Sequence, residues 1–197
     1  MSTFLAAVSR MKYIERWALM RSSRAETLSE HSLEVAMIAH ALCTIGNVRY
    51  GKHLNSEKAA LVGIYHDASE IITGDMPTPV KYYNEDIRTA YKEIEAIAEE
   101  KLVSRLPEDM QQEYLGIFKA DADDPDDLYM RRLVKAADKI SALIKCIEEE
   151  RAGNSEFVTA KASTEKALEA YRAELPEVGD FMDEFLPSYG KTLDELS

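Results

Sequence analysis

The chain has 197 residues, of which 46% are hydrophobic and 30% are charged, and its formal net charge is -12. This length is enough for one domain with a sizeable core, and the hydrophobic content is that of a globular protein rather than a disordered one. A nucleic-acid groove needs clustered Lys and Arg, and the sequence has no such cluster. We therefore expect a single domain over residues 1–197, without a nucleic-acid polymer as partner.

Neither a membrane nor an oxidising compartment is indicated. Residues 1–17 lack the basic and then apolar pattern of a secretory signal, and no window approaches the ~20 continuous apolar residues of a membrane span. The two cysteines, Cys43 and Cys146, lie in apolar helical patterns and do not suggest a disulfide framework. The sequence predicts a cytoplasmic protein with no membrane partner.

The hydrophobic pattern is helical throughout, and strand-like alternation is scarce. Helices are expected in chain order near residues 3–12, 28–46, 56–73, 85–105, 108–119, 127–151, 155–173 and 177–187. Thr27 and Glu30 form a capping box before the second helix, and Gly46 or Asn47 can end it. Gly74 can end the third helix. These signals predict an irregular all-α bundle.

Two further expectations concern packing. Within helix 56–73, Ile64, Ala68 and Ile71 are expected to face the core, as are Tyr82 and Tyr83 further along the chain.

The acidic segment DADDPDD (121–127) is the sharpest change in composition along the chain. A calcium-binding loop would need a Gly and a closing bidentate Glu at fixed spacings, and both are absent. A solvated acidic loop is therefore expected.

His66 and Asp67 are adjacent in the expected helix 56–73, and Glu70 follows within about one turn. Adjacent helical residues point about 100° apart, so the pair reaches one ion only if that ion lies at the helix edge. Glu70 is placed on the same helix face as the pair, where it is either a proton carrier or an ordinary surface carboxylate. Other ligands must come from other elements.

Three other histidines are available as ligands. His31 lies at the start of helix 28–46, and His40 lies on roughly the opposite face of that helix. His53 falls in an expected turn, where a solvated side chain is the simpler interpretation. His31 is therefore the better candidate.

Asp138 flanks an apolar stripe on helix 127–151 formed by Leu133, Ala137, Ile140, Ile144 and Ile147. Taken alone, it is best interpreted as a surface carboxylate paired with Lys135 or Lys145. A buried carboxylate would instead need a partner such as a metal ion. With His31, His66 and Asp67 it would complete a set of two imidazoles and two carboxylates, which suits a divalent transition ion.

The order of these residues, a His, a contiguous His-Asp pair and a later Asp, resembles the HD-domain metallophosphohydrolases. A closer resemblance, to the bacterial 5'-deoxynucleotidase family of the YfbR type, spans nearly the whole chain. It is carried by ERWALM (15–20), SEHSLEVAMIAHAL (29–42), YHDASEIITGDMPTPVKY (65–82), VKAADKISALIKCIEE (134–149) and GNSEF (153–157).

This resemblance implies an HD-domain bundle, commonly a homodimer, that hydrolyses deoxyribonucleoside 5'-monophosphates to nucleoside and phosphate. By position it implies a divalent ion, such as Co²⁺ or Mn²⁺, held by His31, His66, Asp67 and Asp138. Glu70 would be the catalytic carboxylate, with Arg16 and Asp67 also in the catalytic set. The implied substrate contacts are Arg16, Trp17, Asp67, Asp75, Met76, Pro77, Thr78 and Asp138.

Several of these residues have simpler interpretations, which stay open. Arg16 can be a surface residue paired with Glu15, and Trp17 can anchor a core or an interface. The flanking prolines restrict the backbone of Thr78, which suits a loop that discriminates deoxyribose from ribose.

Two alternative functions are kept. One is hydrolysis of another nucleotide, a dNTP or a cyclic dinucleotide, by the same fold. A triphosphate needs several basic side chains, and the sequence offers Arg16 with Lys81 as a second candidate. The other alternative is a helical nucleotide-binding module without activity, which the complete set of ligand positions disfavours.

Overall fold

The computed structural model describes every residue except Tyr82, and it leaves out the side chains of Thr78 and Pro79. Within this part of the chain the regular elements are helices, and the extended pairing is limited to an isolated bridge between Glu15 and Thr27. The predicted all-α bundle is confirmed. None of the described helices is both long and apolar enough to cross a membrane.

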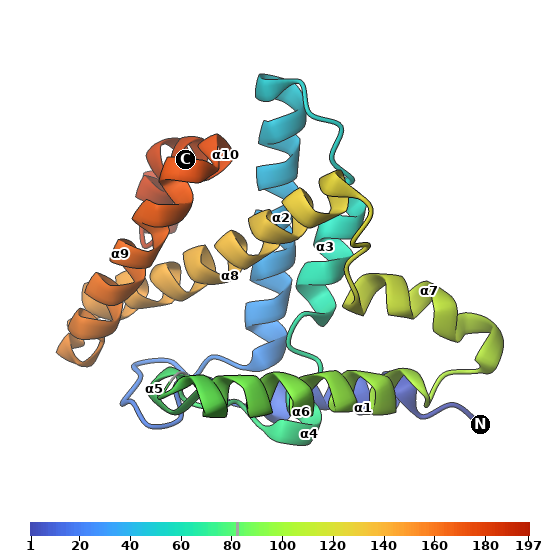
Figure 1. The fold of residues 1–197 in the computed structure, drawn as a ribbon. Coiled ribbons are helices and arrows are strands. Elements are labelled where there is room, and N and C mark those ends of the chain that lie inside the picture. The colour runs from blue at the N-terminus through green and yellow to red at the C-terminus, as the bar shows by residue number, and fades with distance from the viewer. Residues whose placement is uncertain (82) are drawn as a thin grey trace.

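The helices surround a long central one (Figure 1). In chain order they are α1 (Phe4–Val8), η1 (Ser9–Tyr13), α2 (Leu28–Tyr50), α3 (Ser56–Tyr65), α4 (Glu70–Thr73), α5 (Thr78–Lys81), α6 (Glu85–Val103), α7 (Glu108–Phe118), α8 (Pro125–Arg151), η2 (Ser155–Phe157), α9 (Val158–Glu174), α10 (Pro176–Glu184), η3 (Leu186–Ser188) and η4 (Leu193–Leu196). Figure 1 shows α2 upright at the centre with α8 crossing it, α9 and α10 to one side, α7 to the other, and α6 lying across below α2. The helix that carries His31 therefore meets the helix that carries Asp138.

The start of α2 is as predicted, and its end is not. The hydroxyl of Thr27 accepts from the backbone N–H of Glu30, whose carboxylate accepts from the N–H of Thr27. The predicted end at Gly46 or Asn47 is wrong. The helix continues to Gly51, whose φ of 64° suits glycine. Asn47 instead uses its amide to bind the backbone of the following loop.

Two hydrophobic clusters form the core. The larger lies among α2, α3, α8, α9 and α10, and it contains the predicted stripe of α8. Leu133, Ala137, Ile140 and Ile144 are at most 1% exposed, and Ile147 is half-buried against them. The smaller cluster lies among α1, the start of α2, α6 and α7. Helix α2 and the segment from α3 to Ala68 contribute to both clusters, and these parts of the chain carry His31, His66 and Asp67.

The predicted continuous helix 56–73 is wrong. Helix α3 ends at Tyr65, a turn follows, and α4 begins at Glu70. At this end the imidazole Nδ1 of His66 lies 2.8 Å from the carbonyl of Gly63, and the next backbone bonds span three residues instead of four. The His-Asp pair therefore lies in a tight turn, where adjacent side chains can point to one place.

The packing predictions meet different outcomes. Ala68 is fully buried and Ile71 packs against the smaller cluster, as expected. Ile64 is 37% exposed on the outer side of α3, so that prediction is wrong. Tyr83 is also wrongly placed in the core, because it is exposed just before α6 begins. Tyr82 lies outside the described residues.

The acidic segment is only partly the solvated loop that we expected. Asp124 caps α8 by accepting from the backbone N–H groups that follow it. Asp127 is buried, and it forms ion pairs with Lys58 at 2.6 Å and with Arg131 at 2.8 Å. One carboxylate of the segment thus joins α3 to α8. Cys43 and Cys146 are buried free thiols, as predicted.

Candidate active site

Two histidines and an aspartate meet where α2 approaches the turn after α3. Single ligand atoms of His31, His66 and Asp67 all lie within 4.8 Å of one another. Oδ2 of Asp67 is 3.0 Å from Nε2 of His66 and 3.7 Å from Nε2 of His31. Asp138 of α8 lies next to them, with Oδ1 3.2 Å from Nε2 of His31. The structure thus brings the four candidate ligands together from three separate segments.

Both imidazoles turn Nε2 toward this centre. Nδ1 of His66 faces the carbonyl of Gly63, which can only accept, so Nδ1 carries a proton and Nε2 points to the carboxylates. Nδ1 of His31 lies 3.0 Å from the hydroxyl of Ser141. Among the described residues, neither buried Nε2 has a hydrogen-bond partner. Two such nitrogens beside two carboxylates fit a divalent transition ion.

The charges of the site follow from burial and proximity. Burial lowers the pKa of His31, and the nearby Arg16 adds to this effect, so the ring is neutral at physiological pH. Burial opposes ionisation of both His66 and Asp67, but each stabilises the charged form of the other. The pKa of His66 is raised and that of Asp67 is lowered. Asp67 therefore stays an anion, as a metal ligand must.

Glu70 is buried at the start of α4, with 6% of its surface exposed. Its Oε2 has no hydrogen-bond partner among the described residues. Burial raises the pKa of Glu70 to about 9, and the carboxylates of Asp67 and Asp75 reinforce the shift. A buried carboxyl with a perturbed pKa in such a place is a candidate proton carrier. Its placement on one helix face with the His-Asp pair is corrected, because the helix breaks between them.

Arg16 and Trp17 are held by one carboxylate that the sequence reasoning did not single out. Oε2 of Glu26 accepts from Nη1 of Arg16 at 2.8 Å and from the indole nitrogen of Trp17 at 2.9 Å. The suggested pairing of Arg16 with Glu15 is therefore wrong. Trp17 has a φ of 61°, a strained conformation for a bulky residue, and its ring meets Phe157 edge-on.

The loop that carries Arg16 and Trp17 is hydrogen-bonded to the C-terminal end of α8 and to the residues that follow it. Lys145, Glu149 and Asn154 bind backbone groups of residues 21–24, and we call these three side chains the loop clamp. Lys145 and Glu149 also form a buried ion pair. The segment GNSEF, noticed in the sequence, thus supplies Asn154 to the clamp and Phe157 to the indole of Trp17.

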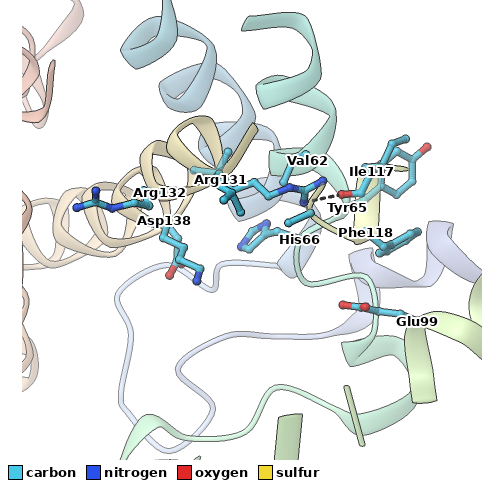
Figure 2. Close-up of a pocket in the computed structure, with 13 residues that line it drawn as sticks. Val62, Tyr65, His66, Glu99, Ile117, Phe118, Arg131, Arg132 and Asp138 are labelled. Carbon is cyan, nitrogen blue, oxygen red and sulfur yellow. Dashed lines mark hydrogen bonds between the residues drawn. The ribbon is translucent and has the colours of Figure 1, made fainter. Parts of the chain in front are cut away.

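A cavity of about 540 Å³ opens beside the candidate metal centre. Figure 2 shows His66 and Asp138 on one side of it, with Tyr65, Ile117 and Phe118 on the other. Arg131, at its edge, donates to the carbonyl of Ile117 and pairs with a buried aspartate, so it serves the fold. The volume is in the range of small-molecule sites.

The remaining candidate substrate contacts follow α4. The predicted end at Gly74 is confirmed, with a φ of 74°. Asp75 lies half-buried among the site charges, which include Arg16 and Asp67. Met76 and Pro77 are half-buried, and the side chain of Thr78 lies outside the described residues.

The other two histidines, His40 and His53, are exposed and lie apart from this centre.

The family is settled by sequence. The family described as 5'-deoxynucleotidase YfbR-like matches residues 3–189. The chain belongs to this YfbR-like family. Among curated relatives, 5'-deoxynucleotidase of Erwinia tasmaniensis is 49% identical, covering 100% of this chain and 96% of the relative. 5'-Deoxynucleotidase YfbR of Escherichia coli O1:K1 is 48% identical with the same coverage.

Solved structures give the same fold. An HD-domain phosphohydrolase from Listeria innocua has a TM-score of 0.80 at 25% identity, covering 95% of this chain and 88% of that one. The HD phosphohydrolase DatZ of cyanophage S-2L, described as bound to dA and one catalytic Zn²⁺, has a TM-score of 0.66 at 18% identity, covering 95% and 96%. The YfbR-like chain is thus an HD-domain bundle.

Proposed function

We propose that this protein is a metal-dependent 5'-deoxynucleotidase, which hydrolyses deoxyribonucleoside 5'-monophosphates to deoxyribonucleosides and phosphate. One observation carries the proposal. Two buried imidazole nitrogens that have no hydrogen-bond partner among the described residues face the carboxylates of Asp67 and Asp138. Arg16, a donor suited to phosphate, lies within the field of those carboxylates. Membership of the YfbR-like family supports the substrate class.

His31, His66, Asp67 and Asp138 would hold the divalent ion, and their mixed nitrogen and oxygen donors suit Co²⁺, Mn²⁺ or a similar metal. Such an ion supplies a lowered pKa for bound water and partial neutralisation of the phosphate charge. Asp67 and Asp138 also border the place where the phosphate would lie, which is why both belong to the proposed substrate contacts.

Arg16 would bind two phosphate oxygens with its planar guanidinium and stabilise charge that gathers on them during the reaction. As a water oxygen bonds to phosphorus, the bond from phosphorus to the 5' oxygen breaks. Glu70, which its raised pKa of about 9 keeps protonated at neutral pH, would give its proton to the leaving 5' oxygen and take up the proton that the water releases. A role as proton carrier accounts for a buried carboxyl whose Oε2 has no hydrogen-bond partner among the described residues.

The sugar would lie against Trp17 and the segment 75–78. Asp75 can accept a hydrogen bond from a sugar hydroxyl, and the indole of Trp17 offers an apolar face. Met76, Pro77 and Thr78 complete the proposed wall. A wall without a polar partner for a 2' hydroxyl would disfavour ribonucleotides.

A monophosphate is favoured over a triphosphate by the state of the second cation. Nζ of Lys81 lies 2.6 Å from Oε1 of Glu95, so this lysine is already neutralised. Arg16 is also paired, with Glu26, but only one of its guanidinium nitrogens is used by the described residues, so other N–H donors remain for a single phosphate.

Phosphate release from a panel of dNMPs, NMPs and dNTPs tests the proposal. Metal-stripped protein is assayed alone and with Co²⁺, Mn²⁺, Mg²⁺ or Zn²⁺, beside Glu70→Ala. We expect release from dNMPs that requires metal and is lost in the variant. Release chiefly from dNTPs or NMPs would overturn the substrate class, and no release with any metal would overturn the activity.

We also propose a cytoplasmic homodimer. Leu33 and Met37 on α2, with Leu61 and Ile64 on the neighbouring α3, expose 37–59% of their surfaces as an apolar strip suited to a second copy. The two free thiols suit a reducing compartment. Light scattering during size exclusion should give twice the chain mass, and a monomeric mass for the wild type would contradict the dimer.

A further inference from the structure

His31 is held from behind by a chain of two hydrogen bonds that reaches Glu34. Nδ1 of His31 lies 3.0 Å from Oγ of Ser141, and that hydroxyl donates to Oε2 of Glu34 at 2.6 Å. His31 and Ser141 are fully buried, so no water competes for these groups. These two hydrogen bonds link α2 to α8, the two helices that carry His31 and Asp138.

The direction of this chain decides which nitrogen of His31 is bare. A hydroxyl has one proton, and an ionised carboxylate can only accept. Ser141 therefore gives its proton to Glu34 and presents a lone pair to His31, so Nδ1 of His31 must carry the ring proton. Nε2, which faces Asp138 and Asp67, is left free to bind a cation.

We propose that Glu34 and Ser141 are positioning residues that fix the tautomer and orientation of His31 for metal binding. This inference rests on the metal site of the proposed function. Partners of this kind around a metal-binding histidine commonly affect metal affinity by about 10–100-fold.

His66 provides an internal reference. Its Nδ1 faces a backbone carbonyl, which no side-chain substitution removes. A change at Glu34 or Ser141 should therefore alter the tautomer of His31 and leave the proton on Nδ1 of His66 in place.

Three substitutions separate the effect of the His31–Ser141–Glu34 hydrogen bonds, called the relay from here on, from a general loss of folding. Glu34→Leu removes the acceptor, so the Ser141 hydroxyl can donate to Nδ1 and place the ring proton on Nε2. Ser141→Ala removes the link itself. Glu34→Gln keeps an acceptor oxygen for Ser141 and should retain most of the metal affinity. Ser32→Ala is the matched control, because Ser32 is buried on α2 and its hydroxyl has no hydrogen-bond partner among the described groups.

Titration calorimetry of the metal-stripped full chain with Co²⁺ gives the first measurement. Burial raises the pKa of Glu34 to about 7, so the titration is made at pH 8. We expect Glu34→Leu and Ser141→Ala to weaken Co²⁺ binding by about 10–100-fold, and Ser32→Ala to match the wild type. Wild-type affinity in both relay variants would overturn the proposal.

Nitrogen-15 NMR of the metal-free wild type gives a second measurement that needs no variant to fold. The expected result is a proton on Nδ1 of both His31 and His66, and a proton on Nε2 of His31 would overturn the proposal. If these results hold while no dNMP is hydrolysed, the proposed activity fails and the positioning role stands.

Discussion

One carboxylate oxygen organises the two side chains that are proposed to meet the substrate first. Oε2 of Glu26 accepts hydrogen bonds from the side chains of both Arg16 and Trp17. All three residues lie in the loop between η1 and α2, outside the helices. The shared acceptor fixes the guanidinium relative to the indole, and it helps to keep Trp17 at its positive φ of 61°. Strain of this kind persists only where the surroundings impose it.

Removal of this carboxylate should lower activity more than stability. We expect Glu26→Ala to reduce kcat/KM for a dNMP by about 10–100-fold, the equivalent of one charged hydrogen bond of about 1.5–3 kcal/mol. Steady-state kinetics of phosphate release measures this change. Glu15→Ala is the control, since Glu15 is exposed in the same loop. Equal kinetics for both variants would show that Glu26 does not position Arg16.

The residues of the site differ in how far the sequence predicts them. His31, the His-Asp pair and Asp138 belong to an ordered pattern of metal-binding residue types, so their proximity was predictable. Glu26 and Glu34 belong to no pattern, and they matter only because folding places each beside one particular donor. Contacts of this kind become visible only in three dimensions.

At the scale of elements, α3 crosses α2 at a glycine. A Cβ added to Gly63 would lie 2.7 Å from Cα of Ala36 and 2.8 Å from its backbone nitrogen, and backbone atoms cannot move aside cheaply. The carbonyl of the same Gly63 faces Nδ1 of His66. The helix crossing and the imidazole orientation therefore depend on one residue.

Gly63→Ala should force the two helices apart and displace the His66 ring. We expect a loss of about 1–3 kcal/mol in the free energy of unfolding, as for overpacked cores, together with weaker Co²⁺ binding. Urea unfolding and calorimetry measure the two effects. Gly116→Ala in α7 is the control, because an added Cβ there meets open space and alanine favours a helix. Unchanged stability of Gly63→Ala would refute the close crossing.

The loop clamp on α8 combines a structural and a positioning role. Lys145 is 5% exposed and Glu149 is 1% exposed, so Glu149→Ala leaves a buried ammonium without its partner. We expect a cost of roughly 3–5 kcal/mol in unfolding free energy. The double variant Lys145→Met/Glu149→Leu should recover much of this stability but not kcat/KM, because the loop backbone stays untethered. Recovery of both would show that the clamp acts through stability alone.

The same carboxylate gives a pH dependence with a defined sign. Burial opposes ionisation of Glu149, but its bonds from Lys145 and the loop backbone lower its pKa from 4.5 to about 2. A lowered folded-state pKa stabilises the protein fully above pH 4.5, and this contribution is lost as the pH falls toward about 2. The stability difference between wild type and Glu149→Gln should therefore shrink over that interval, as followed by urea unfolding. A difference that stays constant would contradict the lowered pKa.

The element boundaries show where sequence reasoning fails. Gly46 resembles a helix end, but it lies inside α2. Glycine is needed there for close packing, because an added Cβ would lie 2.8 Å from the carboxylate of Glu177. The helix break after Tyr65 is not predictable from the sequence. Residues 66–73 contain no Pro or Gly and are compatible with a continuous helix. Tertiary packing decides both cases.

At the scale of the molecule, the candidate ligands join segments that are far apart in the chain. His31, Asp67 and Asp138 belong to α2, the turn after α3, and α8. An ion that binds only the folded chain should stabilise it by mass action, by about 2.7 kcal/mol at a concentration 100 times its Kd. Urea unfolding with Co²⁺ tests this, with the exposed His40→Ala as a variant that keeps the effect. Stabilisation that persists in His31→Ala would place the ion elsewhere.

The four carboxylates near Arg16 affect the order in which a cation and a nucleotide would bind. Burial alone would lower the pKa of Arg16, and it is raised because Glu26, Asp138, Asp67 and Asp75 surround the guanidinium. A phosphate dianion that approaches this group without a metal cation meets net repulsion. We therefore expect the cation to bind before the nucleotide does and to stay bound until the products have left. A bound dNMP should consequently slow the removal of the cation by a chelator.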